Sequence, residues 1–206
     1  CGLHTEHLEV GPTAIRRLVC AMSDRRRHEN VMAINFGRNS SYITVVSGAR
    51  LLFDQAIQFG ETALVKRIAA ELEMPEEAVI KLVQQHSLLP DADAGSAQSR
   101  EISETLAQIV KPEFLRLVEE INRTLIYTAS QTHGKQISRI YILGSLARWT
   151  GTEEMLKGLV ELDVKTIPDP LKPFFAAGKR LGNVGEPAPE IAVATGLALN
   201  GMLADD

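Results

Sequence analysis

The sequence contains only two cysteines, one tryptophan and no long hydrophobic run, and each shortage excludes a class of protein. Two cysteines cannot form a disulfide framework, so a reducing, cytosolic compartment is expected. No apolar segment approaches the roughly 20 residues that a membrane-spanning helix needs. The net charge of −4 gives no electrostatic reason to expect nucleic-acid binding. The sequence therefore predicts a soluble chain, long enough at 206 residues to bury a substantial core.

Short catalytic and metal-binding motifs are also absent from the sequence. It has neither the G-x-S-x-G turn of serine hydrolases nor the G-x-x-x-x-G-K-[ST] phosphate loop. The five histidines are scattered, and no pair has the i, i+4 spacing with a carboxylate partner that favours zinc. No catalytic residue and no metal site are therefore predicted. The basic run at residues 25–28 is interpreted as a solvated loop rather than a phosphate or lipid contact.

The spacing of the apolar residues predicts a mixed α/β fold. Strands are expected near residues 8–10 and at 31–36, 42–46, 51–58, 137–145 and 162–167. Those at 31–36, 42–46 and 51–58 are expected to form an antiparallel meander. The expected helices cover residues 13–23, 61–86 with a break near Pro75, 102–132 with a kink or restart at Pro112, a stretch ending at Leu159, and 188–203. Residues 87–100 are small and polar, which predicts a loop. On the long helix, Arg116 with Glu120 and Glu119 with Arg123 are expected i, i+4 ion pairs.

A polar turn separates the first two strands of the meander. Its residues are Gly37, Arg38, Asn39, Ser40 and Ser41. Glycine lets a backbone approach phosphate oxygens closely, and the side chains add hydrogen-bond donors and a cation. A hairpin tip in water needs the same residue types, so the turn taken alone does not distinguish the two interpretations.

A second candidate site follows the strand at 137–145. Gly144 and Ser145 stand where this strand turns toward a helix, a common place for a ligand in α/β sheets. A tight connection without a ligand explains the same residues. Trp149, shortly afterwards, is predicted to be a packing residue.

The order of these segments resembles the second half of the actin-like ATPase fold, and most closely the PilM family of type IV pilus assembly proteins, related to FtsA. The likeness covers nearly the whole sequence. Its motifs are Asn35-Phe36-Gly37 at the second phosphate loop, Gly60-Glu61, the helix at 76–81, Leu143-Gly144-Ser145 at the adenosine motif, and the closing segment 196–200. The segment "LEVGPTAIRRL" is similar to the stretch before the phosphate loop.

This resemblance implies an actin-like (ribonuclease H-like) α/β domain with a mixed sheet and a helical second subdomain. Residues 1–30 would end a preceding subdomain and form a linking helix. Residues 31–60 and 134–206 would form the sheet subdomain, and residues 61–133 the mainly helical one. A nucleotide would lie between the two, its β-phosphate at residues 37–41, its adenosine at Gly144 and Ser145, and its ribose near Lys66.

Three departures from the family pattern weaken the implied nucleotide site. The family's phosphate-loop aspartate is Asn35 here, and an amide lacks the negative charge that helps hold Mg²⁺. Second glycines of the family are replaced by Glu61 and Ser145, and a carboxylate near a phosphate repels it. The opening of the sequence is typical of a domain interior, so we expect a piece of a longer protein whose first phosphate loop precedes Cys1. ATP and Mg²⁺ are the implied cofactors, and we expect no ATP hydrolysis by this piece alone.

The implied role is a cytoplasmic scaffold, peripheral to the inner membrane, that binds the cytoplasmic tail of a PilN-like membrane protein. A homo-oligomer is compatible with this role. One rival is a GspL-like cytoplasmic domain of type II secretion, which would continue into a transmembrane helix. Other rivals are an active actin-fold ATPase or sugar kinase, which needs a carboxylate at position 35, and a plain α/β domain without a ligand.

Overall fold

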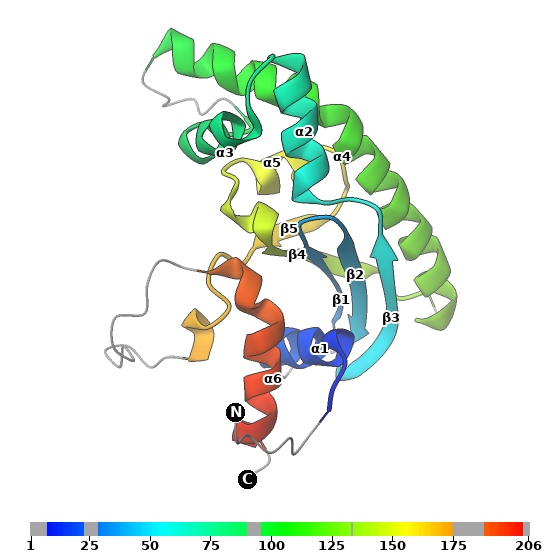
Figure 1. Ribbon diagram of the computed structural model, residues 1–206. Helices are drawn as coiled ribbons and strands as arrows, with labels where there is room; N and C mark the ends of the chain where they lie inside the picture. Colours follow the sequence, from blue (N-terminus) through cyan, green and yellow to red (C-terminus); the bar gives the residue numbers. More distant parts are fainter. Residues whose placement is uncertain (1–7, 23–28, 90–95, 133, 175–187, 204–206) are drawn as a thin grey trace, which may run out of the picture.

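A mixed five-stranded sheet forms the centre of the computed structural model, which describes residues 8–22, 29–89, 96–132, 134–174 and 188–203 (Figure 1). The strands are β1 (Asn30–Phe36), β2 (Ser41–Ser47), β3 (Arg50–Ile57), β4 (Ile137–Gly144) and β5 (Asp163–Thr166). Their order is β3-β2-β1-β4-β5. The pairs β1–β2 and β2–β3 are antiparallel, whereas β1–β4 and β4–β5 are parallel. The predicted meander and the mixed α/β sheet are confirmed.

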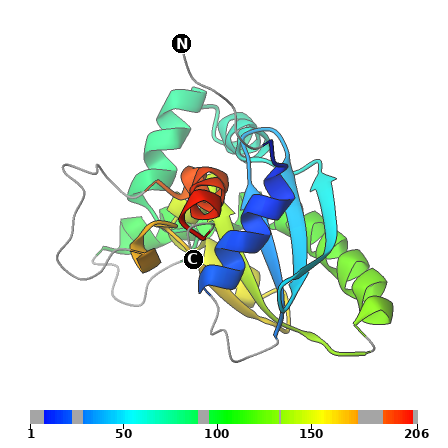
Figure 2. The same ribbon diagram turned by 90° about the horizontal axis from the view of Figure 1, so that it is seen from below.

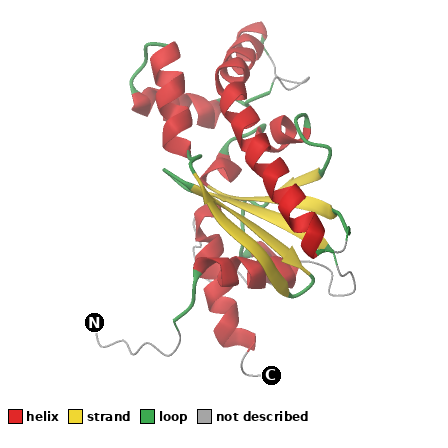
Figure 3. Cartoon of the chain, turned by 90° about the vertical axis from the view of Figure 1, so that its right-hand side faces the viewer, coloured by secondary structure: helices red, strands yellow, loops and turns green. Residues whose placement is uncertain are grey.

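Helices cover both faces of this sheet. They are α1 (Gly11–Met22), α2 (Glu61–Glu71), α3 (Glu76–Gln85), α4 (Ala97–Gln131), α5 (Thr152–Lys157) and α6 (Ala192–Leu203), with short 3₁₀ helices η1 (Ser145–Arg148), η2 (Lys172–Phe174) and η3 (Pro189–Ile191). Figure 2 shows α1 and α6 side by side over one face, and Figure 3 shows the long α4 along the other. Helices α2 and α3 lie beyond one end of the strands (Figure 1). Within the described residues no helix is both long and apolar enough to cross a membrane.

Strand β1 is buried on both faces because its two sets of alternating side chains enter two different cores. Met32, Ile34 and Phe36 belong to the core that includes α2, α3 and α4. Val31 and Ala33 belong to the core formed with α1 and α6. An almost continuously apolar strand is what such two-sided burial requires. The turn that follows β1 is therefore fixed to the most deeply buried strand of the sheet.

Helix α4 departs from its predicted course. It begins at Ala97 rather than near residue 102, because the Ser96 side chain caps it by accepting a hydrogen bond from the Ser99 N–H. It runs through Pro112 as one helix of 35 residues, with this proline on its exposed side. The predicted loop at 87–100 is therefore wrong for its last residues.

Three smaller predictions are also wrong. The ion pairs on α4 join Glu113 to Arg116 (3.1 Å) and Glu120 to Arg123 (2.7 Å), so they are i, i+3 pairs and not the expected i, i+4 pairs. Residues 8–10 do not form a strand, and the connection after β4 is η1 followed by α5 rather than one helix to Leu159. The basic run at 25–28 lies outside the described residues.

Candidate functional site

A cavity of about 880 Å³ opens where the carboxyl ends of β1 and β4 meet the first turns of α2 and α3. Ligands of open α/β sheets bind at this edge. Seven of the nine predicted site residues line the cavity: Asn35, Gly37, Arg38, Asn39, Lys66, Gly144 and Ser145. The other two, Ser40 and Ser41, are not part of its lining. Sequence segments more than 100 residues apart are thus brought together as the resemblance implied.

Ser41 stabilises the polar turn from inside the protein. Its side chain is fully buried, and its hydroxyl donates to the carbonyl oxygen of Phe59 at 2.5 Å. The same hydroxyl oxygen accepts a hydrogen bond from the Gly37 N–H at 3.4 Å. Ser41 therefore links the turn to the segment after β3. Its hydroxyl both donates and accepts a hydrogen bond within the protein.

The polar turn also binds the start of α2. The N–H groups of Glu61 and Thr62 donate to the carbonyl oxygens of Gly37 (3.1 Å) and Arg38 (2.8 Å). A side chain at Gly60 would place its Cβ 2.6 Å from the carbonyl carbon of Asn39, so only glycine permits this contact. The first N–H groups of a helix are ordinarily free to bind an anion. Here two of them are already satisfied by the turn.

Gly144 and Ser145 also line the cavity. Gly144 has φ +78° and ψ −157°, a conformation essentially restricted to glycine. The Ser145 hydroxyl is buried and has no hydrogen-bond partner among the described residues. A buried polar group of this kind is rarely left unpaired in a native protein. The hydroxyl oxygen is itself closed off from solvent, so the observation that fits a nucleoside is the cavity that Gly144 and Ser145 line, and not this oxygen.

Three glutamates also line the cavity. None is among the predicted ligand-binding residues, although the resemblance implied that Glu61 lies near the phosphates. Arg148 donates hydrogen bonds to the Glu190 carboxylate, one of them from Nη2 to Oε2 at 2.8 Å. These hydrogen bonds lower the pKa of the Glu190 carboxyl. Glu61 accepts a hydrogen bond from Trp149 Nε1 at 3.0 Å. Trp149 is buried, as predicted, but its polar contact was not expected. Glu76, at the start of α3, is exposed.

Within the described ranges, no three or more histidine, cysteine, aspartate or glutamate side chains are grouped so that they could hold a metal ion. Asn35, where the family resemblance implies a carboxylate, is an amide. Carboxylate oxygens are the ligands that Mg²⁺ prefers, so the residues present do not fit a directly bound Mg²⁺.

A smaller cavity of about 310 Å³ adjoins Asn35 and contains the half-buried carboxyl of Asp54. Burial raises the pKa of Asp54 above its ordinary value of 3.8, and a hydrogen bond from Thr44 Oγ1 at 2.6 Å offsets part of that rise. A raised pKa means that the folded protein binds the proton of this carboxyl more tightly than the unfolded chain does. The stability contributed by this group is therefore present in acid and is lost as the pH rises above the unfolded-state value.

Asp54→Asn is accordingly expected to stabilise the protein slightly at neutral pH. The gain should be below about 1 kcal/mol, because the site is only half buried and asparagine can still accept the Thr44 hydrogen bond. Urea unfolding of both proteins at pH 7 and at pH 3 measures the difference. A gain that persists at pH 3, where Asp54 is itself protonated, would contradict this explanation.

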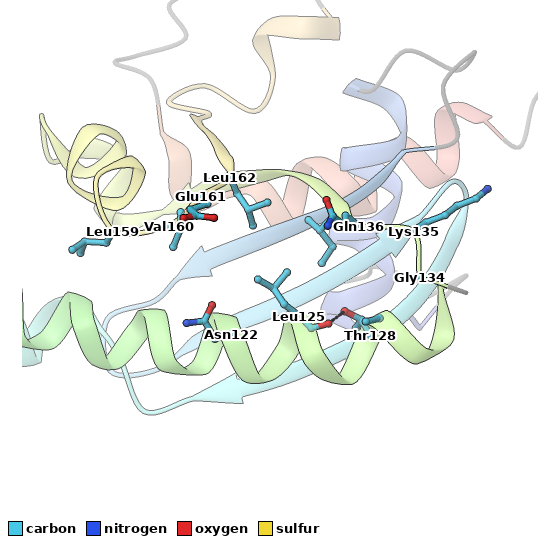
Figure 4. Close-up of a pocket in the computed structure, with 12 residues that line it drawn as sticks. Asn122, Leu125, Thr128, Gly134, Lys135, Gln136, Leu159, Val160, Glu161 and Leu162 are labelled. Carbon is cyan, nitrogen blue, oxygen red and sulfur yellow. Dashed lines mark hydrogen bonds between the residues drawn. The ribbon is translucent and has the colours of Figure 1, made fainter.

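A third cavity, of about 510 Å³, lies between the second half of α4, the start of β4 and residues 159–162. Figure 4 shows Leu125 on α4 facing this space, with Leu159 and Leu162 on its other side. Its charged lining residues are Lys135 and Glu161. None of the predicted site residues lines it.

The chain is similar to known proteins both in sequence and in structure. A sequence model of the family described as type IV pilus assembly protein PilM matches residues 10–202. None of the curated protein sequences matches the chain. Many solved structures are also similar to the chain. The structure titled PilM-PilN type IV pilus biogenesis complex has a TM-score of 0.70 and 18% identity, over 97% of this chain and 54% of that one.

Two further examples among the similar structures are of other proteins. MreB5 of Spiroplasma citri bound to AMPPNP has a TM-score of 0.62 and 12% identity, over 94% of this chain and 59% of that one. The ethanolamine utilization protein EutJ from Carboxydothermus hydrogenoformans has a TM-score of 0.59 and 14% identity, over 92% and 53%. The chain spans between half and three fifths of the length of these structures. Together the similarities show that it has the actin-like fold.

Proposed function

The chain belongs to the PilM family of type IV pilus assembly proteins, and from this premise we propose that it is part of a cytoplasmic scaffold for pilus assembly at the inner membrane. The family match over residues 10–202 carries the proposal, because it includes every helix and strand from α1 to α6 except the last residue of α6. The similar fold in the complex of PilM with PilN supports a PilN-like membrane protein as the partner. The same match favours this role over a GspL-like domain, a kinase or an active ATPase.

Binding of the partner's tail is the direct test of this function. The intact protein would be titrated calorimetrically with a synthetic peptide of the cytoplasmic tail of the PilN-like protein from the same genome. Saturable binding is expected, and a scrambled peptide of the same composition should not bind. Equal heats from the two peptides would reject the scaffold role.

A weak nucleotide site is the second part of the proposed function. Its support is the cavity that brings Asn35, Gly37, Lys66 and Gly144 together. In this proposal residues 31–60 and 134–206 form the sheet subdomain, residues 61–133 form the helical subdomain, and the nucleotide lies between them. Because Asn35 supplies no negative charge, any Mg²⁺ would enter bound to the phosphates of the nucleotide. Hydrolysis by this chain alone is not expected.

Asn35→Asp is expected to raise the affinity for Mg-ATP about tenfold, since it restores a carboxylate beside the phosphate turn. Asn35 lies half-buried at the end of β1, so the isosteric change should leave the fold intact. Calorimetric titration with Mg-ATP, and with ATP in EDTA as the control, measures the effect. An unchanged affinity for Mg-ATP would count against the assignment of residues 35–41 as a phosphate loop.

A further inference from the structure

The Glu61 carboxylate occupies a fixed position in the candidate cavity. The backbone of this residue is anchored by the hydrogen bond from its N–H to Gly37 O, and its side chain accepts a hydrogen bond from Trp149 Nε1. Trp149 is itself only 4% exposed, so the donor cannot move away without disturbing the core. An indole N–H is uncharged. The hydrogen bond therefore orients the carboxylate without cancelling its negative charge.

The other charged side chains of the cavity contribute less to its electrostatic potential than Glu61 does. Arg38, Lys66 and Glu76 are exposed, so water and salt screen their charges. Glu190 is paired with Arg148. Glu61 is half-buried, and the field of a charge is stronger where less water surrounds it.

The helix start that carries Glu61 does not compensate for its charge. The N–H groups of residues 61 and 62, which would ordinarily attract a phosphate, donate instead to carbonyl oxygens of the polar turn. Gly144 and Ser145, which also line the cavity, carry no charge. The cavity thus combines an uncharged lining at these two residues with a fixed negative charge at Glu61.

We propose that Glu61 determines which ligand this cavity accepts, favouring a nucleoside over its free triphosphate. The inference rests on the proposed nucleotide site and specifies its ligand. Like charges held close together in a partly buried site repel, and the repulsion grows with the negative charge of the ligand. Adenosine avoids this repulsion, whereas metal-free ATP experiences it in full.

Calorimetric titration of the intact protein with adenosine and with ATP, both in EDTA, tests the proposal. Glu61→Gln removes the charge but keeps an oxygen that accepts the Trp149 N–H. We expect it to raise the affinity for ATP by about tenfold and to leave the affinity for adenosine unchanged. Glu77→Gln is the matched control, because Glu77 is an exposed glutamate beside Glu76 that does not line the cavity. It should change neither affinity by more than about twofold.

The outcomes separate this inference from the nucleotide site on which it rests. If adenosine binds but Glu61→Gln leaves the ratio of the ATP and adenosine affinities unchanged, the inference is wrong and the site stands. The same holds if Glu77→Gln changes that ratio equally. If neither adenosine nor ATP binds to any of the three proteins, the nucleotide site itself is rejected and the inference with it.

Discussion

Replacing Gly144 by alanine is expected to lower the free energy of unfolding by more than about 3 kcal/mol, and leucine should lower it further. Two costs add at this position. Its φ of +78° and ψ of −157° belong to a region that side chains with a Cβ almost never occupy. An added Cβ would also lie 2.1 Å from the carbonyl oxygen of Phe36, inside the contact between β1 and β4. Neither strand can yield, because both are buried.

Gly134→Ala separates the two costs. Gly134 also has a positive φ, +80°, but a Cβ there would meet nothing within 4 Å. Its replacement should therefore cost only the conformational strain, about 1–2 kcal/mol. Urea unfolding of the wild type and the two alanine variants provides the comparison. Equal losses at positions 134 and 144 would show that the close contact between β1 and β4 is not as the structure has it.

The architecture of the sheet was largely predictable from sequence because its strands are chemically distinct. The run from Val31 to Phe36 is apolar on both faces, and short turns leave the next two strands no arrangement but a meander. The start of α4 was missed because a single serine, Ser96, decides it, and capping is a local contact that periodicity does not reveal. The ion pairs on α4 were misplaced because i+3 and i+4 partners are equally near along a helix.

The residues of the candidate cavity were predictable where the composition of a turn or a known family motif indicated them. Asn35, Gly37, Gly144 and Ser145 belong to such motifs, and the structure brings them together. The link between Glu61 and Trp149 joins residues 88 positions apart, and no pattern in the sequence indicates it. Ser41 was expected to face a ligand, but its side chain is buried and stabilises the turn from inside the protein. The reason is that alternation along β2 directs this side chain into the protein.

Gly196→Ala should destabilise the protein by about 2–3 kcal/mol, although the same change usually stabilises a helix. Gly196 lies on α6 where this helix crosses α1, and an added Cβ would be 2.1 Å from the carbonyl oxygen of Ala14. The two helices are also joined by Arg17 of α1, whose Nη1 donates to the Gly196 carbonyl at 2.9 Å. To admit a methyl group the helices must separate, which weakens this hydrogen bond and the core beneath them.

Gly201→Ala on the same helix gives the opposite expectation and serves as the control. A Cβ at Gly201 meets nothing within 4 Å, so only the helix propensity changes, which favours alanine by up to about 1 kcal/mol. Thermal and urea unfolding should therefore place the two variants on opposite sides of the wild type. A stabilised Gly196→Ala protein would mean that α6 does not pack against α1 at this residue. The face of the sheet opposite α4 would then be covered in another way.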